Sequence, residues 1–132
     1  MRLAVITISD RASRGEYEDL SGPELERGLR AAYPDAEIRR ALVADEADAI
    51  ADALLAHADA DFIITTGGTG LGARDITPEV TARFCEKELP GIAEALRAES
   101  LKETPQAMLS RGYAGLRGRT VVVTHFAPSL RS

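Results

Sequence analysis

A glycine-rich segment that directly follows an apolar run is the part of this sequence best suited to binding a ligand. Residues 65–72 read Thr-Thr-Gly-Gly-Thr-Gly-Leu-Gly, after Phe62-Ile63-Ile64. Glycine permits positive φ and lacks the Cβ that would obstruct a ligand. Successive backbone N–H groups in such a turn can form an anion-binding nest, and threonine hydroxyls add donors. The candidate phosphate-binding residues are Gly67, Gly68, Thr69 and Gly70. A loop that only needs tight turns is the alternative interpretation.

The segment matches neither of two common phosphate-loop patterns. No Gly-Lys-Ser/Thr follows it, which excludes a Walker A loop, and its spacing departs from the dinucleotide pattern Gly-x-Gly-x-x-Gly. The charged residues that come next extend the candidate site. Arg74 could clamp a phosphate, and Asp75 could hold Mg²⁺, which binds phosphates together with one or two carboxylates. Locally, Asp75 could instead be a turn residue, and Thr77 could be a helix N-cap.

Polar residues also follow the first two predicted strands. Ser9 and Asp10, which come after the first strand, could hydrogen-bond a ligand, and Asp45 stands at the end of the second. Because ligands bind beyond the carboxyl ends of parallel strands, we expect Asp45 and Asp75 at one edge of the sheet. Two carboxylates beside a phosphate-binding loop indicate a metal–nucleotide site. The alternatives are a helix N-cap for Asp45 and a polar surface loop for Ser9 and Asp10.

These residues need a scaffold, and the sequence predicts one of alternating strands and helices. Apolar runs predict strands over residues 3–8, 37–43, 61–66 and 119–124. Helices are expected after the capping-box spacing of Ser21 to Glu24, after Asp45, and near Pro78, Pro90 and Pro105. This alternation predicts βαβ units, a mainly parallel sheet with helices on both faces, and one α/β domain over residues 1–132.

Composition excludes several classes of function. The net charge of −5 argues against nonspecific nucleic-acid binding, which needs a basic surface. A single cysteine, Cys85, rules out a disulfide within the chain and makes a cysteine-based metal site unfavourable. No apolar stretch reaches the roughly 18 residues of a membrane span, and the first residues lack a signal-peptide pattern. We therefore expect a cytoplasmic protein with no membrane partner.

Taken together, the motifs resemble the MoaB/Mog family of molybdenum-cofactor biosynthesis proteins. The resemblance runs from the first residues to about Val123 and so covers nearly the whole chain. Its most specific part is Thr-Thr-Gly-Gly-Thr-Gly followed by Arg-Asp-x-Thr-Pro. The matching stretches are Ile8 to Ser13, Ala44-Asp45-Glu46, Thr65 to Gly70, Arg74 to Glu79, Leu89-Pro90-Gly91, Leu109-Ser110-Arg111, Ala114-Gly115 and Arg117 to Thr120.

The resemblance implies a fold, an activity and a set of site residues. The fold is a three-layer α/β/α sandwich, usually assembled as a homotrimer. Family enzymes transfer AMP from ATP to the terminal phosphate of molybdopterin, with Mg²⁺. By motif position, Asp45 and Asp75 match the family's two functionally important aspartates, which could carry catalysis and hold Mg²⁺. Ser9, Asp10 and Ser110 match positions near the ligand, and Gly67, Gly68, Thr69 and Gly70 match the ligand-binding loop.

The match stops abruptly after the last predicted strand. Relatives continue with a Pro-Gly-Ser loop and a further helix and strand, whereas this chain reads Thr124-His125-Phe126-Ala127-Pro128 and ends at Ser132. A frameshift, a truncation and natural divergence all remain open. Loss of a covering helix should expose an apolar face of the sheet unless a subunit partner covers it.

Three functions therefore compete. The first is a molybdopterin adenylyltransferase, a nucleotidyltransferase, which the two aspartates favour. The second is a non-catalytic pterin- or nucleotide-binding oligomer of the same family, which the altered C-terminal segment favours. The third is a related enzyme acting on another nucleotide, such as a pyrophosphatase.

Overall fold

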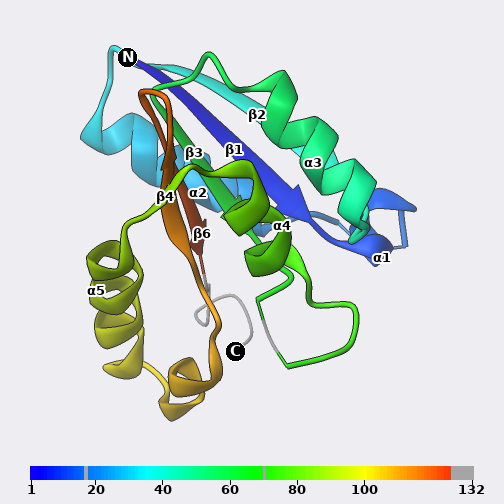
Figure 1. Ribbon diagram of the computed structural model, residues 1–132. Helices are drawn as coiled ribbons and strands as arrows, with labels where there is room; N and C mark the ends of the chain where they lie inside the picture. The colour runs from blue at the N-terminus through cyan, green and yellow to red at the C-terminus, as the bar shows by residue number, and fades with distance from the viewer. Residues whose placement is uncertain (17, 70, 126–132) are drawn as a thin grey trace.

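The computed structural model describes residues 1–16, 18–69 and 71–125 (Figure 1). Six strands form the sheet: β1 (Arg2–Ile8), β2 (Glu37–Val43), β3 (Phe62–Thr66), β4 (Lys87–Glu88), β5 (Ala114–Arg117) and β6 (Thr120–His125). The helices are α1 (Asp10–Ser13), α2 (Ser21–Ala32), α3 (Ala47–Ala56), α4 (Thr77–Phe84), α5 (Pro90–Leu101) and the 3₁₀ helix η1 (Pro105–Leu109). Of these helices, none is long and apolar enough to cross a membrane.

The sheet is mixed but mainly parallel. Its strand order is β2-β1-β3-β6-β5-β4, with β1, β2, β3 and β6 parallel to one another. At the edge opposite β2, β5 runs antiparallel to β6, and β4 runs antiparallel to β5. The prediction of a mainly parallel α/β sheet is confirmed. The sequence did not predict β4 and β5, which form this antiparallel margin.

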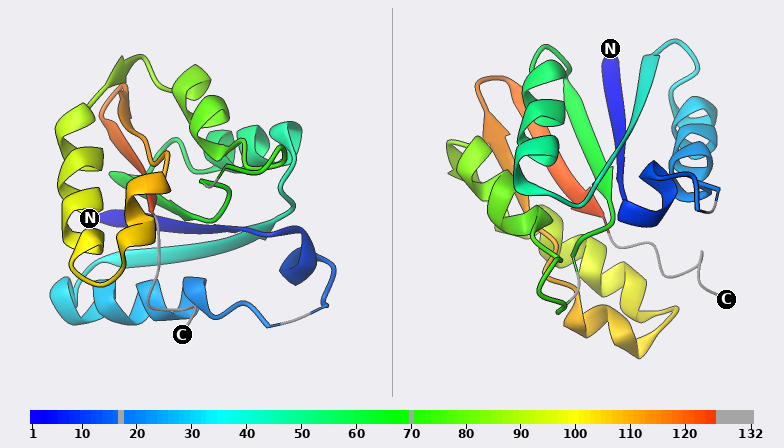
Figure 2. Two further views of the ribbon diagram at one scale, coloured as in Figure 1. Left: turned by 90° about the horizontal axis from the view of Figure 1, so that it is seen from below. Right: turned by 90° about the vertical axis from the view of Figure 1, so that its right-hand side faces the viewer.

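Helices cover both faces of the sheet, so the predicted three-layer arrangement is confirmed. Figure 2 shows α2 on one side of the strands and α3 with α4 on the other. Alternate residues of β1 serve the two layers: Ala4, Ile6 and Ile8 join the core cluster with α3 and α4, whereas Leu3 and Val5 lie on the face toward α2. Because both faces are covered, β1 is one nearly continuous buried apolar run.

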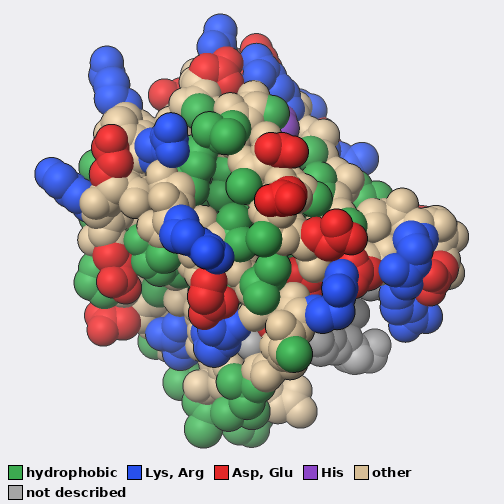
Figure 3. Space-filling view, turned by 45° about the vertical axis from the view of Figure 1, so that its right-hand side comes forward, with side chains coloured by type: hydrophobic (Ala, Val, Ile, Leu, Met, Phe, Trp, Pro, Cys, Tyr) green, Lys and Arg blue, Asp and Glu red, His purple; other side chains and the backbone are tan. Residues whose placement is uncertain are grey.

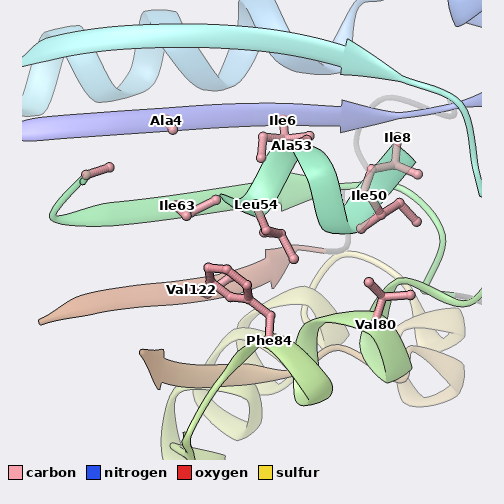
Figure 4. Packing of buried hydrophobic residues seen from close by; sticks show 11 residues of the cluster. Ala4, Ile6, Ile8, Ile50, Ala53, Leu54, Ile63, Val80, Phe84 and Val122 are labelled. Atoms are coloured by element: carbon pink, nitrogen blue, oxygen red, sulfur yellow. The ribbon is translucent and has the colours of Figure 1, made fainter. Parts of the chain in front are cut away.

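The main core lies between the sheet and the α3–α4 layer (Figure 4). The helical spacing after Asp45 predicts Ala47, Ile50, Leu54 and Ala58 on one buried stripe. Ile50 and Leu54 of α3 indeed have no exposed surface. Full burial of such a side chain is worth about 1.5–3 kcal/mol, so these two residues contribute strongly to holding α3 on the sheet. Ala58, predicted on the same stripe, is exposed because α3 ends at Ala56.

Two predicted helix starts are wrong in detail. Ser21 does not cap α2: it is the first helical residue, and Asp19 accepts a hydrogen bond from the Gly22 N–H at 3.1 Å instead. Asp45 does not cap α3, whose N-cap is Glu46 without a side-chain hydrogen bond. In both cases the local sequence does not specify the outcome. At α2 the hydrogen bond comes from Asp19, two residues before Ser21, and at α3 the N-cap is the residue after Asp45.

The face toward α2 is covered over β1 more completely than over β3. Phe62 shares this face with Leu3 and is 39% exposed, against 2% for Leu3. The predictions about residues 126–132 lie outside the part of the chain that the structure describes.

Candidate functional site

The carboxyl ends of the parallel strands bring the predicted residues to one edge of the sheet. Ser9 follows β1, Asp45 comes two residues after β2, and Gly67 follows β3. The Ser9 N–H donates to the Val43 carbonyl at 2.9 Å, which joins the first two of these segments. Figure 1 shows α1 and the loop after β3 at the same end of the molecule. The expected edge position is therefore confirmed.

Asp45 has a carboxylate oxygen with nothing to bind. Its Oδ1 is buried and, among the described residues, makes no hydrogen bond. Burial, followed by the negative charges of Asp75 and Asp10, raises the pKa of Asp45 to about 6, and Arg74 acts the other way. A buried oxygen without a donor costs free energy, so a partner such as water, an ion or a ligand would stabilise it.

Thr77 provides a second such oxygen beside the same glycine. Thr77 is the first residue of α4 rather than its N-cap, and its buried Oγ1 has no partner within the described chain. Gly68 lies between the two, since a Cβ built on it would stand 2.2 Å from Thr77 Oγ1 and 3.4 Å from Asp45 Oδ1. Gly68 has φ +70°, a conformation that side chains rarely adopt. Glycine here keeps a side chain out of the space beside both oxygens.

Gly67 is required for a different reason. Its φ is +105°, and a Cβ on it would lie 2.2 Å from the backbone oxygen of Ile8. The close approach of β3's end to β1 therefore excludes any side chain at this position. The tight-turn interpretation explains Gly67, whereas Gly68 faces the two unpartnered oxygens.

Asp10 and Arg74 form an ion pair that holds Asp45 in place. Asp10 Oδ1 accepts from the Asp45 N–H at 2.9 Å, and Asp10 Oδ2 lies 2.7 Å from Arg74 Nη2. Arg74 also donates to the Asp45 carbonyl at 3.1 Å. The Asp45 N–H, followed by Arg74, lowers the pKa of Asp10. Asp10 thus has both oxygens engaged and supports Asp45, and its contact with a ligand stays a prediction.

Asp75 is oriented by the turn that contains it. Its Oδ2 accepts from the Gly72 N–H at 2.9 Å, and its own N–H donates to the Gly72 carbonyl at 3.0 Å. The turn-residue alternative is therefore correct for Asp75. It does not exclude a ligand role, because the charge of Asp75 is near enough to raise the pKa of Asp45.

The other predicted site residues have structural roles that the sequence did not specify. Ser9 caps α1 by accepting from the Ala12 N–H, and Ser110 Oγ accepts from the Gly112 N–H at 3.3 Å. Thr69 is buried, and its carbonyl accepts from the Arg111 N–H at 2.9 Å. Gly70 lies outside the described residues.

The residues at this edge fit a metal ion only as part of a ligand complex. Within residues 1–16, 18–69 and 71–125, no group of three or more His, Cys, Asp or Glu side chains could hold a metal by itself. Asp45 and Asp75 would supply two carboxylates, one with an unpartnered buried oxygen. Mg²⁺ commonly takes one or two carboxylates together with substrate phosphates, so this donor set suits Mg²⁺ carried with a nucleotide.

Two further residues of the site were not among the predicted ones. Thr77 was interpreted as a helix cap, and Arg111 was noticed only within a matching stretch. The motif Arg-Asp-x-Thr-Pro contains the signal for Thr77, because its hydroxyl follows the predicted Asp75 by two residues. Nothing local identifies Arg111, which reaches the loop from 36 residues further along the chain.

Comparisons with known proteins agree with this geometry. Residues 4–128 match the family model described as "Probable molybdopterin binding domain". A protein of Helicobacter pylori named molybdopterin adenylyltransferase is 43% identical over 127 residues, which are 93% of this chain and 72% of that protein. The crystal structure of the molybdopterin biosynthesis enzyme MoaB from Thermus thermophilus superposes with a TM-score of 0.86 and 41% identity, covering 97% of this chain and 82% of that one.

A molybdopterin biosynthesis protein from Mycobacterium abscessus has a TM-score of 0.90 at 34% identity, covering 98% and 82% of the two chains. The family match spans nearly the whole chain, and the relatives share both its sequence and its fold. The resemblance seen in the motifs is confirmed: this chain belongs to the molybdopterin-binding-domain family of molybdenum cofactor biosynthesis proteins.

Proposed function

We propose that this chain is a molybdopterin adenylyltransferase, which transfers AMP from ATP to the terminal phosphate of molybdopterin. The observation that carries the proposal is the pair of buried, unpartnered oxygens of Asp45 and Thr77 on either side of Gly68. They stand at the edge of a parallel sheet where ligands bind, next to a glycine-rich loop. The relative named molybdopterin adenylyltransferase supports the choice of reaction.

In this proposal the residues bind and align two phosphates. A terminal phosphate oxygen of molybdopterin attacks the α-phosphorus of ATP, and the bond from that phosphorus to the bridging oxygen breaks as pyrophosphate leaves. The backbone N–H groups of residues 67–69 face the developing negative charge, and Thr77 Oγ1 donates to a phosphate oxygen. Alignment provides much of the rate gain, and no covalent enzyme intermediate is needed.

Arg74 must change partner for this chemistry. In the structure it donates to Asp10 and to the Asp45 carbonyl, and its side chain is 62% exposed. An incoming phosphate can compete for the guanidinium, which binds phosphate in bidentate fashion. Asp45 and Asp75 are the proposed Mg²⁺ ligands, and the ion would neutralise charge on the pyrophosphate.

The decisive experiment compares the parent chain with Asp75→Asn and with Asp52→Asn, whose side chain is exposed on α3. Adenylyl-molybdopterin and pyrophosphate are quantified with Mg-ATP in the presence and absence of molybdopterin. We expect turnover that requires molybdopterin, a drop of at least about 100-fold in Asp75→Asn, and no change in Asp52→Asn. Equal turnover by Asp75→Asn removes that residue from the mechanism.

The remaining outcomes separate the competing functions. Saturable binding of molybdopterin without turnover favours the non-catalytic binding module, and pyrophosphate release without molybdopterin favours an enzyme acting on another nucleotide. The homotrimer that the resemblance implies is part of the proposal, and the same samples are suited to a measurement of mass in solution.

A further inference from the structure

Arg111 has no predicted role, yet it contacts both ends of the loop that holds the candidate site. Its backbone N–H donates to the Thr69 carbonyl at 2.9 Å. Its guanidinium donates to the Asp75 carbonyl, and also to both carboxylate oxygens of Glu79, with Oε1 at 3.3 Å. One residue therefore bridges the chain from Thr69 to Asp75.

The base of Arg111 is itself held firmly. Arg97 of α5 donates from Nε to the Ser110 carbonyl at 3.0 Å and from Nη2 to the Gly112 carbonyl at 3.1 Å. The two residues that flank Arg111 are thus fixed to a helix outside the site. A side chain that reaches out from such an anchored segment can hold a loop in place, because its own backbone has little freedom to move.

The contact reaches Asp75 through its backbone and leaves its carboxylate available. Asp75 Oδ2 bonds the Gly72 N–H, and Thr77 N–H bonds the Gly68 carbonyl at 3.2 Å, so the loop is cross-linked at several points. Within residues 1–16, 18–69 and 71–125, the printed contacts of Arg111 tie the loop to the opposite side, toward η1 and β5. Among the described contacts, they are what sets the position of Asp75 relative to that side.

We propose that Arg111 is a positioning residue, whose guanidinium fixes the Asp75 segment of the loop so that the two aspartates face one bound ligand. The inference rests on the proposed adenylyl transfer for its kinetic consequence, but its structural part stands independently. Glu79 orients the guanidinium. The carboxylate of Glu79 is not one of the two carboxylates, Asp45 and Asp75, that are proposed to bind the ligand. The ion pair lowers the pKa of Glu79, so the contact persists at neutral pH.

The test uses four variants of the full chain. Arg111→Gln removes the charged fork, and Arg111→Lys keeps a charge that cannot reach Asp75 and Glu79 together. Glu79→Gln weakens the ion pair and leaves the contact with the Asp75 carbonyl. Arg119→Gln, in the exposed turn between β5 and β6, is the type-matched control. Each is measured for kcat, for KM of both substrates, and for hydrogen exchange of the Gly72 N–H.

For Arg111→Gln we expect kcat to fall by about 10- to 100-fold with KM changed less than about threefold, because misalignment affects the reacting geometry. The Gly72 N–H should exchange at least about tenfold faster, while amides of β1 stay protected. Arg111→Lys and Glu79→Gln should fall between Arg111→Gln and the parent, because each keeps part of the Arg111 contacts, and Arg119→Gln should stay within about threefold of the parent.

Several results would overturn the inference. Parental kcat in Arg111→Gln, unchanged exchange at Gly72, or an equal loss in Glu79→Gln each remove the positioning role of the Asp75 contact. If the parent shows no turnover, the proposed function fails, and exchange at Gly72 alone decides the structural part. If Arg111→Gln also loses protection in β1, Arg111→Lys decides in its place, with the same direction of change expected.

Discussion

The carboxylate of Asp45 lies where its negative charge lowers the stability of the folded protein. Burial, Asp75 and Asp10 together raise its pKa to about 6, from an ordinary value near 3.8. For a carboxyl whose folded pKa is raised, the stabilising effect is present at pH values below the unfolded pKa and is lost as pH rises through the folded pKa. The ionised form of Asp45 therefore destabilises the free protein at neutral pH.

We accordingly predict that Asp45→Asn raises the melting temperature at pH 7–8 in the absence of metal and nucleotide. The gain should shrink between about pH 6 and pH 4, where the parent carboxyl becomes protonated in the folded state, and should vanish below about pH 4, where it is protonated in both states. Adenylyl transfer should be lost in the same variant, a common exchange of stability against activity at functional residues. Melting curves at pH 4, 6 and 8 check the sign. A lower melting temperature at pH 8 would show that the Asp45 charge is satisfied within the protein.

The sequence could place the site residues at one edge of the sheet but could not assign the work of each. Asp45 and Thr77 were each open to interpretation as helix caps, and both instead have buried oxygens without partners. Asp75 does take the turn role that its local sequence allows, whereas Ser9, for which the alternative was a polar surface loop, caps α1. The difference depends on which chain segment arrives opposite each oxygen. Such contacts join residues that are distant in the sequence, as Arg111 and Asp75 are, and the local sequence therefore does not predict them.

At the scale of elements, two glycines in contrasting positions make a matched pair. Gly68 lies in the loop with positive φ, and an added Cβ would meet Thr77 Oγ1 at 2.2 Å. Gly28 lies in the middle of α2 with no atom within 4 Å of a Cβ position. Alanine should therefore have opposite effects at the two positions.

We predict that Gly28→Ala stabilises the fold by about 0.5–1 kcal/mol, since alanine is the better helix former. That corresponds to an increase of roughly 2–5 °C in melting temperature for a chain of this size. Gly68→Ala should lose about 1–2 kcal/mol from the left-handed backbone conformation and lose molybdopterin binding. Chemical denaturation and calorimetric titration measure both effects. Unimpaired binding by Gly68→Ala would mean that the space between Asp45 and Thr77 does not receive the ligand.

The elements themselves were predicted unevenly, for physical reasons. The strands β1, β3 and β6 have apolar centres because helices cover them, whereas β2 interleaves charged residues with its apolar ones, and the sequence pattern identified all four. The strand β4 has only two residues, Lys87 and Glu88, both exposed, so no apolar pattern marks it. The strand β5 is short and contains Gly115, and its pairing with β6 depends on the turn at Gly118, which has φ +59°. Short strands of this kind can be predicted only when the strand with which they pair is known.

At the scale of the whole molecule, the surface distinguishes one region. Figure 3 shows acidic and basic side chains interspersed, with apolar side chains gathered at the lower end, where η1 lies. Three of the most exposed apolar residues come from this end: Leu101 is 42% exposed, Met108 64% and Leu109 53%. They form what we call the η1 patch. Exposed apolar clusters of this kind commonly mark contacts between proteins.

We predict that the η1 patch lies in the interface of a homotrimer. The parent assembly should then have three times the 14.1 kDa mass of one chain. Stable interfaces bury about 800 Å² on each partner, and placing a charge among their apolar residues is strongly unfavourable. Met108→Lys should therefore dissociate the parent assembly into single chains. Leu55→Lys, at a 54% exposed position on α3, should leave it intact. Light scattering coupled to gel filtration measures both masses.

Dissociation by Leu55→Lys alone would move the interface to α3, and a monomeric parent would contradict the trimer. Because η1 is joined to the Arg111 segment at Ser110, an interface on this patch would also restrain the side of the loop that faces Asp75.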